Sequence, residues 1–365
     1  MPLLSRILLG PLEVDIRPGA VGGLARLLAD QRISGGGQVA VAVGPGLGEE
    51  IARRLADTLA TATVFEVHGG SVDEAVRLQD AVRASGRGYD ALVGIGGGRT
   101  LDVAKYAATR LGLPMVSVAT NLAHDGLCSP VSSLETEIGK ESFGVSMPIA
   151  AVVDLDYVRR APVEMVRSGV GDAVSNLSAI ADWELAGRER GERVDGLAVS
   201  FARLAAESVL HHPGHVDDPE FLVVLAEALV LSGIAMTAAG SSRPCSGGDH
   251  EILHAVDRLF PGAGQHGELA GLGALFAASL RVDGERAFAD LDACLRHHDL
   301  PRRPEDVGLT AGQFAEAVSA APATRPDRYT VLEHLALDRP AIDRSIDAYA
   351  DRLGRAVPTA WNAGS

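Results

Sequence analysis

The first 155 residues alternate short β-rich runs with amphipathic helical segments, and this rhythm limits the folds that the chain can adopt. Strand-like apolar runs lie at residues 38–43, 63–67, 91–93, 115–118 and 149–153. Apolar side chains recur with helical spacing at residues 49–59, 71–85 and 99–111. Strands that alternate with helices form a parallel sheet with helices on both faces. The pattern predicts a Rossmann-like α/β domain.

The pattern changes near residue 160. Beyond it, apolar side chains recur every three or four positions at residues 171–187, 196–210, 219–238 and 249–259. Such spacing, with few β-branched runs, is typical of packed helices. A chain of 365 residues is also long for a single core. We therefore expect an α/β domain over residues 1–160 and an all-α domain over residues 161–365.

Composition narrows the range of partners. A net charge of −15 disfavours nucleic acid and anionic membrane surfaces as partners. No apolar run reaches the roughly 18 residues that a membrane helix needs, and residues 1–18 do not resemble a signal peptide. The cysteines, Cys128, Cys245 and Cys294, are odd in number and form no CxxC pair. We expect a cytoplasmic protein without membrane insertion, and its apolar helices favour a homo-oligomer.

A glycine cluster follows one predicted strand and precedes a predicted helix. Glycines in Gly94-Ile95-Gly96-Gly97-Gly98 allow backbone N–H groups to approach a pyrophosphate, and the helix N-terminus favours negative charge. The spacing differs from the six-residue dinucleotide fingerprint, so a tight turn that binds nothing is the alternative. One turn later, Asp102 and Lys105 have the spacing of a solvated ion pair. The earlier cluster at residues 44–48 is interpreted as a plain turn, because its strand ends without an acidic residue for a ribose hydroxyl.

The helical half carries a candidate metal-ligand set. His250 and His254 project from one helix face, His266 opens a later helix, and Asp172 lies in an apolar helix. Two imidazoles and one carboxylate suit a catalytic zinc or iron ion that keeps a further position open. Spacing alone leaves open whether Asp172, His250 and His266 meet, since each also fits an ordinary structural role. The histidines at 211–215 and 297–298 are interpreted as solvated loops.

Four segments resemble a known family. Residues 94–105, GIGGGRTLDVAK, are similar to the GGGxxxDxxK segment of iron-containing alcohol dehydrogenases, glycerol dehydrogenases and dehydroquinate synthases. Residues 120–130, TNLAHDGLCSP, resemble the T-x-x-S-H-D-G-x-x-S-P segment of the sn-glycerol-1-phosphate dehydrogenase family. Residues 171–185 and 241–250 resemble the same family, and the matches together span about residues 90 to 275 in order.

The resemblance implies a dehydroquinate synthase-like fold with the active site between the two domains. It implies NADH or NADPH as cofactor, zinc (alternatively iron) as metal, and reduction of dihydroxyacetone phosphate to sn-glycerol 1-phosphate. The implied metal ligands are Asp172, His250 and His266. Asp125, Asp172 and His254 are implied to contact substrate, with Asp172 and His254 in catalysis. The cofactor-binding set, to which we add Asp102 of the same segment, is Gly96, Gly97, Gly98, Asp102, Thr120 and Ser129.

The sequence departs from the family at three places that concern the cofactor, and one of them is Asn121-Leu122, which replaces a pair that is usually small. Ala123 stands where the family has a nucleotide-contacting serine, and Gly44 stands where relatives often carry aspartate at the end of the first strand. These differences leave the choice between NAD and NADP open. The metal ligands are intact.

We expect the metal to polarise the substrate carbonyl while hydride arrives from the nicotinamide, and a metal-held water or His254 to relay the proton. Arg243 fits either the substrate phosphate or a structural ion pair. The alternative function is a dehydroquinate synthase-like cyclase that uses NAD transiently. Such enzymes use several lysines, whereas this chain has only Lys105 and Lys140. A third reading is a nucleotide- and metal-binding protein without catalysis.

Overall fold

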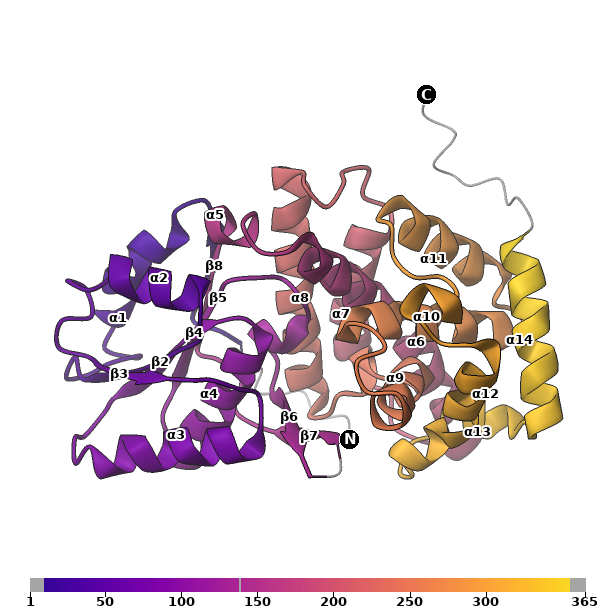
Figure 1. Cartoon of the computed structure of the whole chain (residues 1–365), viewed down its shortest axis with the longest axis horizontal. Coiled ribbons are helices and arrows are strands. Elements are labelled where there is room, and N and C mark those ends of the chain that lie inside the picture. The colour runs from indigo at the N-terminus through magenta and orange to yellow at the C-terminus, as the bar shows by residue number, and fades with distance from the viewer. Residues whose placement is uncertain (1–9, 138, 355–365) are drawn as a thin grey trace, which may run out of the picture.

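The alternating pattern of the first half folds into one six-stranded parallel sheet (Figure 1). The computed structural model describes residues 10–137 and 139–354. The sheet has the strand order β1-β8-β5-β4-β2-β3. Its strands are β1 (Glu13–Arg17), β2 (Val39–Val43), β3 (Thr63–Glu66), β4 (Ala91–Gly96), β5 (Met115–Ala119) and β8 (Ala150–Asp154).

Helices cover both faces of this sheet. They are α1 (Leu24–Leu28), α2 (Leu47–Arg54), α3 (Val72–Ala84), α4 (Gly98–Leu111) and the short α5 (Leu155–Val158). Every residue of β2, β4, β5 and β8 is buried, which explains why these strands are continuous apolar runs. The predicted strands and helices of this half are confirmed, with ends that move by a few residues.

The strand order reverses between β2 and β4. From β2 the chain runs outward to β3 at the sheet edge, then returns to place β4 on the other side of β2. In such sheets a crevice forms beyond the carboxyl ends of the two strands where the order reverses. The turn after β4 contains Gly97 and Gly98, and the turn after β2 contains Pro45. Both turns line one cavity.

Three strands were not predicted. β1 lies at the sheet edge, where only part of each side chain is covered. β6 (Val131–Thr136) and β7 (Gly139–Gly144) form a separate antiparallel hairpin. The hairpin is rich in serine, threonine and charged residues. It therefore lacks the apolar run by which the other strands were found.

The second half is helical, as predicted. Its longer helices are α6 (Val163–Arg190), α7 (Gly196–Leu210), α8 (Pro219–Ala239), α9 (Gly248–Leu259), α10 (His266–Leu280), α11 (Glu285–His297), α12 (Ala311–Ala320) and α14 (Arg339–Leu353). Shorter ones are the five-residue α13 (Val331–Leu335) and the 3-10 helices η3 (Arg243–Cys245), η4 (Pro304–Val307) and η5 (Ala321–Thr324). Another 3-10 helix, η2 (Asp125–Leu127), lies in the first half between β5 and β6. The change from α/β to helical structure falls between α5 and α6, and the domain boundary near residue 160 stays a prediction.

One helix, α8, is long and apolar enough to span a membrane by length and composition, so the prediction that no apolar run reaches this length is wrong. In the fold it packs against α6 and α7, and 61% of its most apolar window is buried inside the protein. Such burial is typical of a helix in the core of a domain. The three cysteines are all buried and free.

Candidate metal and nucleotide site

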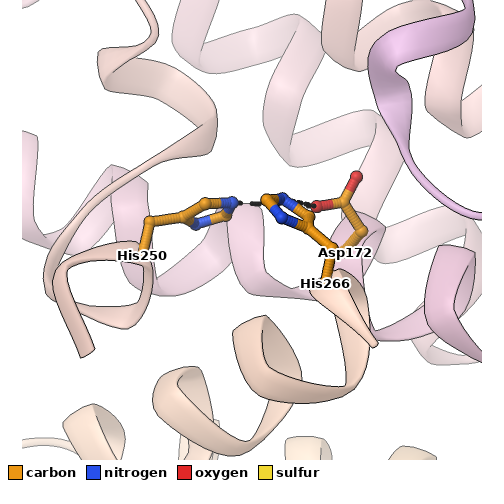
Figure 2. Close-up of side chains that lie close together, drawn as sticks. All are labelled: Asp172, His250 and His266. Atoms are coloured by element: carbon orange, nitrogen blue, oxygen red, sulfur yellow. Dashed lines mark ion pairs between the residues drawn. The ribbon is translucent and has the colours of Figure 1, made fainter. Parts of the chain in front are cut away.

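Three side chains from separate helices converge in the helical half. Asp172 comes from the interior of α6, His250 from the first turn of α9, and His266 is the first residue of α10. Figure 2 shows them pointing toward one another. The Asp172 Oδ1 atom lies 3.8 Å from His250 Nε2 and 3.6 Å from His266 Nε2. Asp172 lies beyond the first turn of α6, so the alternative role of a carboxylate that interacts with the N-terminus of its helix is excluded.

Glycines bring α6 and α10 close enough for Asp172 and His266 to meet. A Cβ atom on Gly267 would lie 1.6 Å from the carbonyl oxygen of Ser168, and one on Gly171 would lie 2.1 Å from the carbonyl oxygen of Gly267. Real Cβ atoms essentially never come within 3.0 Å of such atoms. Asp172 and His266 are therefore each the chain neighbour of a glycine that the helix contact requires.

The spacing of the three donors fits a metal ion. One ligand atom from each residue can be chosen so that all lie within 4.8 Å of one another. Metal bonds of about 2.0–2.2 Å in tetrahedral geometry put ligand atoms roughly 3.4 Å apart. The two distances from Asp172 exceed this by only a few tenths of an ångström. One carboxylate and two imidazoles are a donor set of the zinc or non-haem iron type, with room for a further ligand.

The electrostatics of Asp172 favour a bound cation. Burial, followed by the nearby Asp125 carboxyl, raises the pKa of Asp172 to about 8. Burial likewise raises the pKa of Asp125. The Asp125 backbone N–H donates a 2.8 Å hydrogen bond to Asp172 Oδ2, which leaves Oδ1 toward the histidines. A positive ion between these groups would relieve the cost of burying the carboxylate.

Asp249 orients His250 and was not found from the sequence. Its carboxylate, which is fully buried, forms a short hydrogen bond with His250 Nδ1 and so directs Nε2 toward Asp172. A carboxylate on the far nitrogen of a ligating histidine fixes the ring and makes it a better donor. Burial opposes the charged form of His250, but Asp249 outweighs it and the pKa is raised. Burial and His250 lower the pKa of His266 well below its usual value.

His254 lies one turn beyond His250, as predicted, with its ring 6.4 Å from that of His250. Its Nε2 atom is 2.8 Å from Arg325 Nη2. Because a guanidinium can only donate, Nε2 is the acceptor and the imidazole proton resides on Nδ1. Burial and then Arg325 lower the pKa of His254 well below its usual value, so this ring is neutral.

The nucleotide turn borders a larger cavity, of about 590 Å³. Gly97, Gly98 and Thr120 line it, at the point where the strand order reverses. No side chain caps the start of α4, so its first backbone N–H groups lack partners within the helix. Gly96 has a packing role, because a Cβ there would lie 2.7 Å from Thr100 Cβ. The glycine turn and free helix N-terminus suit a pyrophosphate.

The pair formed by Asp102 and Lys105 is buried, which corrects the prediction of a solvated pair. Lys105 has no exposed surface, and its Nζ lies 3.0 Å from Asp102 Oδ1. The same ammonium donates to the backbone oxygen of Val131 and lies 3.5 Å from Ser129 Oγ. Asp102 and Ser129 thus line the smaller cavity with His250 and His266, rather than the larger one.

His124 connects the two cavities and was also missed as a site residue. Its ring lies 5.6 Å from that of His266, and a Cβ on Gly98 would lie 2.2 Å from its Nε2. His124, His266, Arg99 and Lys140 line both cavities. A dinucleotide in the larger cavity would therefore adjoin the candidate metal site. Residues 120–130 of the resemblance contain His124, which was the available signal.

The structure also tests the interpretations of Arg243 and of the histidines outside the site. Arg243 pairs with Glu192 and donates to the Tyr329 carbonyl, so it is a structural residue. His298 is fully buried and stacks on Phe221 with ring centroids 4.6 Å apart, so its interpretation as a solvated loop residue is wrong. His211 is exposed, in line with the prediction.

Comparison with known proteins defines the class first. A family profile described as iron-containing alcohol dehydrogenase matches residues 15–162. Two solved structures share the fold across the whole chain, a probable glycerol dehydrogenase from Sinorhizobium meliloti (TM-score 0.77, 21% identity, 96% of this chain and 99% of that one) and the glycerol dehydrogenase from Schizosaccharomyces pombe (0.75, 21%, 96% and 91%). The fold and site are those of an NAD(P)-dependent, metal-containing alcohol dehydrogenase.

Two similar relatives narrow the class. The glycerol-1-phosphate dehydrogenase [NAD(P)+] of Hyperthermus butylicus is 34% identical over 94% of this chain and 97% of its own length. That of Cenarchaeum symbiosum is 39% identical over 72% of this chain and 73% of its own length. The chain belongs to the glycerol-1-phosphate dehydrogenase family.

Proposed function

We propose that the protein reduces dihydroxyacetone phosphate to sn-glycerol 1-phosphate with hydride from NADH or NADPH. The observation that carries this proposal is the convergence of Asp172, His250 and His266 beside a cavity bordered by the glycine turn. The relatives named above carry this activity in their names and match most of the chain.

Each group of residues has a task in this reaction. Asp172, His250 and His266 would hold a zinc ion, alternatively iron(II). When bound, such an ion supplies Lewis-acid polarisation of a carbonyl oxygen. Asp125 and Asp172, with His254, would contact the substrate. The nicotinamide dinucleotide would bind through Gly97, Gly98 and Thr120 in the larger cavity, supported by the packing of Gly96 on Thr100. Its nicotinamide end would reach Asp102 and Ser129 in the smaller cavity.

His254 serves the reaction as a neutral hydrogen-bond donor. Arg325 occupies its Nε2, so the available proton is on Nδ1. Because its pKa is low, the ring does not store an extra proton near neutral pH. We assign His254 to orienting the substrate through Nδ1–H, and the proton that completes the alcohol to water.

The cyclase alternative is not favoured. Lys105 is buried in its pair with Asp102 and cannot reach a substrate, which leaves Lys140 as the single other lysine. The relatives are dehydrogenases by name.

Replacing His266 by alanine tests the proposal, with His211→Ala at an exposed position as the control. We expect His266→Ala to lose stoichiometric metal and at least roughly 100-fold in turnover with dihydroxyacetone phosphate, because one of three ligands is gone. His211→Ala should retain both. Metal content by mass spectrometry and nicotinamide oxidation measure the two effects. Full activity of a metal-free His266→Ala protein would refute the assignment.

We also propose a cytoplasmic homo-oligomer. The buried free cysteines support a reducing compartment. Exposed apolar side chains on the helices, such as Leu204 at 56% exposure, support self-association. Sedimentation of the purified protein would give the oligomeric state directly.

A further inference from the structure

Arg325 is a cation on the wall of the smaller cavity, and no carboxylate of the described residues forms an ion pair with it. It follows η5 in the chain and lines the same cavity as His250, His254 and His266. Among residues 10–137 and 139–354, its guanidinium makes no ion pair; its contacts are the hydroxyls of Ser242 (3.5 Å) and Ser142 (3.3 Å), and His254 Nε2. By contrast, Arg281 and Arg243 each pair with a carboxylate.

Glu251, the acidic group that acts most strongly on Arg325, does not neutralise its charge. Glu251 contributes to the electrostatic surroundings of both Arg325 and its neighbour Arg328. Burial, followed by Glu333, raises the pKa of Glu251 to about 9, so it is uncharged near neutral pH. Burial lowers the pKa of Arg325, and the opposing effects of Glu251, Asp327 and Asp249 do not offset it.

The loop that carries Arg325 is fixed. Arg328 donates to the backbone oxygen of Ser246 and, at 2.6 Å, to Ser242 Oγ. Thr324 Oγ1 donates to the Ala321 carbonyl at 2.7 Å. The Arg325 guanidinium is thus preorganised, and the two serine hydroxyls beside it can rotate to donate to a ligand. A planar guanidinium with adjacent hydroxyls is suited to phosphate oxygens.

We propose that Arg325, assisted by Ser142 and Ser242, binds the phosphate group of the substrate and selects phosphorylated over unphosphorylated ketones. The inference rests on the proposed function, because it places the substrate carbonyl at the metal ligands. One cavity joins those ligands to Arg325, with His254 between them. A three-carbon substrate would then contact both ends of the cavity at once. This role replaces the one considered for Arg243, which pairs with Glu192.

The test compares two ketones in three variants. Arg325→Gln removes the charge, Arg325→Lys keeps the charge without the fork, and Arg258→Gln removes an exposed cation that borders only the neighbouring hollow. For Arg325→Gln we expect KM for dihydroxyacetone phosphate to rise roughly 10- to 100-fold, the loss of one or two charge-assisted hydrogen bonds. The inhibition constant of inorganic phosphate should rise in parallel. For Arg325→Lys, both constants should lie between those of wild type and those of Arg325→Gln.

Comparison of the two ketones distinguishes a loss of phosphate binding from a general structural defect in the variant. With dihydroxyacetone, kcat/KM of Arg325→Gln should fall at least roughly tenfold less than with dihydroxyacetone phosphate, because the glutamine amide can still donate to His254 Nε2 and only the phosphate contact is lost. Metal content and the KM for NAD(P)H should match wild type. Arg258→Gln should match wild type with both ketones. An unchanged KM for dihydroxyacetone phosphate in Arg325→Gln overturns the inference. If that variant does not fold, equal losses on both ketones in Arg325→Lys overturn it instead.

Failure of the proposed function gives a different result. Wild-type protein that does not reduce dihydroxyacetone phosphate would refute that function. Titration calorimetry with inorganic phosphate then tests Arg325 alone: binding that is lost in Arg325→Gln supports the anion site, and equal binding in both proteins overturns it.

Discussion

Replacing Gly267 by alanine tests whether a glycine contact, in addition to the ligands, sets the geometry of the metal site. The added Cβ would lie 1.6 Å from the Ser168 carbonyl oxygen and 2.9 Å from the Asp172 nitrogen. Both atoms belong to the backbone of α6, which cannot rotate away as a side chain can. To reach 3.0 Å from the Ser168 oxygen, α10 must move away from α6 by about 1.4 Å.

The size of this movement decides the effect on the metal. His266 is next to Gly267 on α10 and would move with it, whereas Asp172 would stay on α6. Metal–ligand distances tolerate only about 0.2 Å. We therefore expect metal affinity to fall at least roughly 100-fold. Overpacking of the two helices should also destabilise the protein by roughly 1–3 kcal/mol.

Alanine substitutions at two further glycines should have progressively smaller effects on metal affinity. A Cβ on Gly271, one turn along α10, would lie 3.1 Å from Leu295 Cδ2 and 3.2 Å from Gly171 Cα, so its neighbours need to give by only a few tenths of an ångström. Gly271→Ala should lose only a few-fold in metal affinity, since the required shift is close to the tolerance of a metal site. A Cβ on the exposed Gly312 of α12 would meet no atom closer than 3.9 Å. Gly312→Ala should keep full affinity and stabilise the protein by roughly 0.5–1 kcal/mol.

The assay is competitive metal titration with a chromogenic chelator, together with urea unfolding of each metal-free protein. The affinity should fall in the order Gly312, Gly271, Gly267. Wild-type metal affinity in a folded Gly267→Ala protein would refute the reasoning, because the ligands would then hold their geometry without the glycine contact.

Two more perturbations test other parts of the structure. Asp249→Asn should lower metal affinity roughly 10- to 100-fold while the fold persists, since it weakens the group that orients His250; unchanged affinity would show that Asp249 has no such role. His298 is buried, and burial followed by His297 and His215 lowers its pKa to about 3, below the usual 6.5. The unfolded chain therefore binds this proton more readily, and stability falls as pH drops below about 6.5 toward 3; between pH 7.5 and 5 the loss is roughly 2 kcal/mol. His298→Phe, which keeps a ring on Phe221, should remove that part of the acid sensitivity, and equal shifts of the urea midpoint in both proteins would contradict this.

Much of the α/β half could be predicted because its strands are buried on both faces. β2 and β4 are apolar throughout, so their positions follow from composition and length alone. The β6–β7 hairpin has no such signal, because it is polar and only partly covered. Lys105 was misjudged because helical spacing identifies neighbours but does not show which side of α4 is buried.

The spacing of residues along the chain could not show that the candidate metal ligands meet in space. Asp172 and His266 meet through the contact of Gly171 with Gly267, which no local pattern encodes. The resemblance to a family supplied the ligand set, and the structure brings its members together. Asp249 is the chain neighbour of His250, but adjacency does not show that its carboxylate turns back to Nδ1. Arg325 reaches His254 from a distant part of the chain, so that contact required coordinates.

The small number of lysines makes selective chemical labelling of the site practical. Lys105 is sealed inside the protein, while the side chain of Lys140 is 41% exposed and lines both cavities. An amine-directed dye applied to the folded protein at mildly alkaline pH therefore has one side-chain amine to attach to, where the two cavities meet. A fluorophore placed there without any engineered cysteine would report the arrival of nucleotide or ketone as a change in its emission.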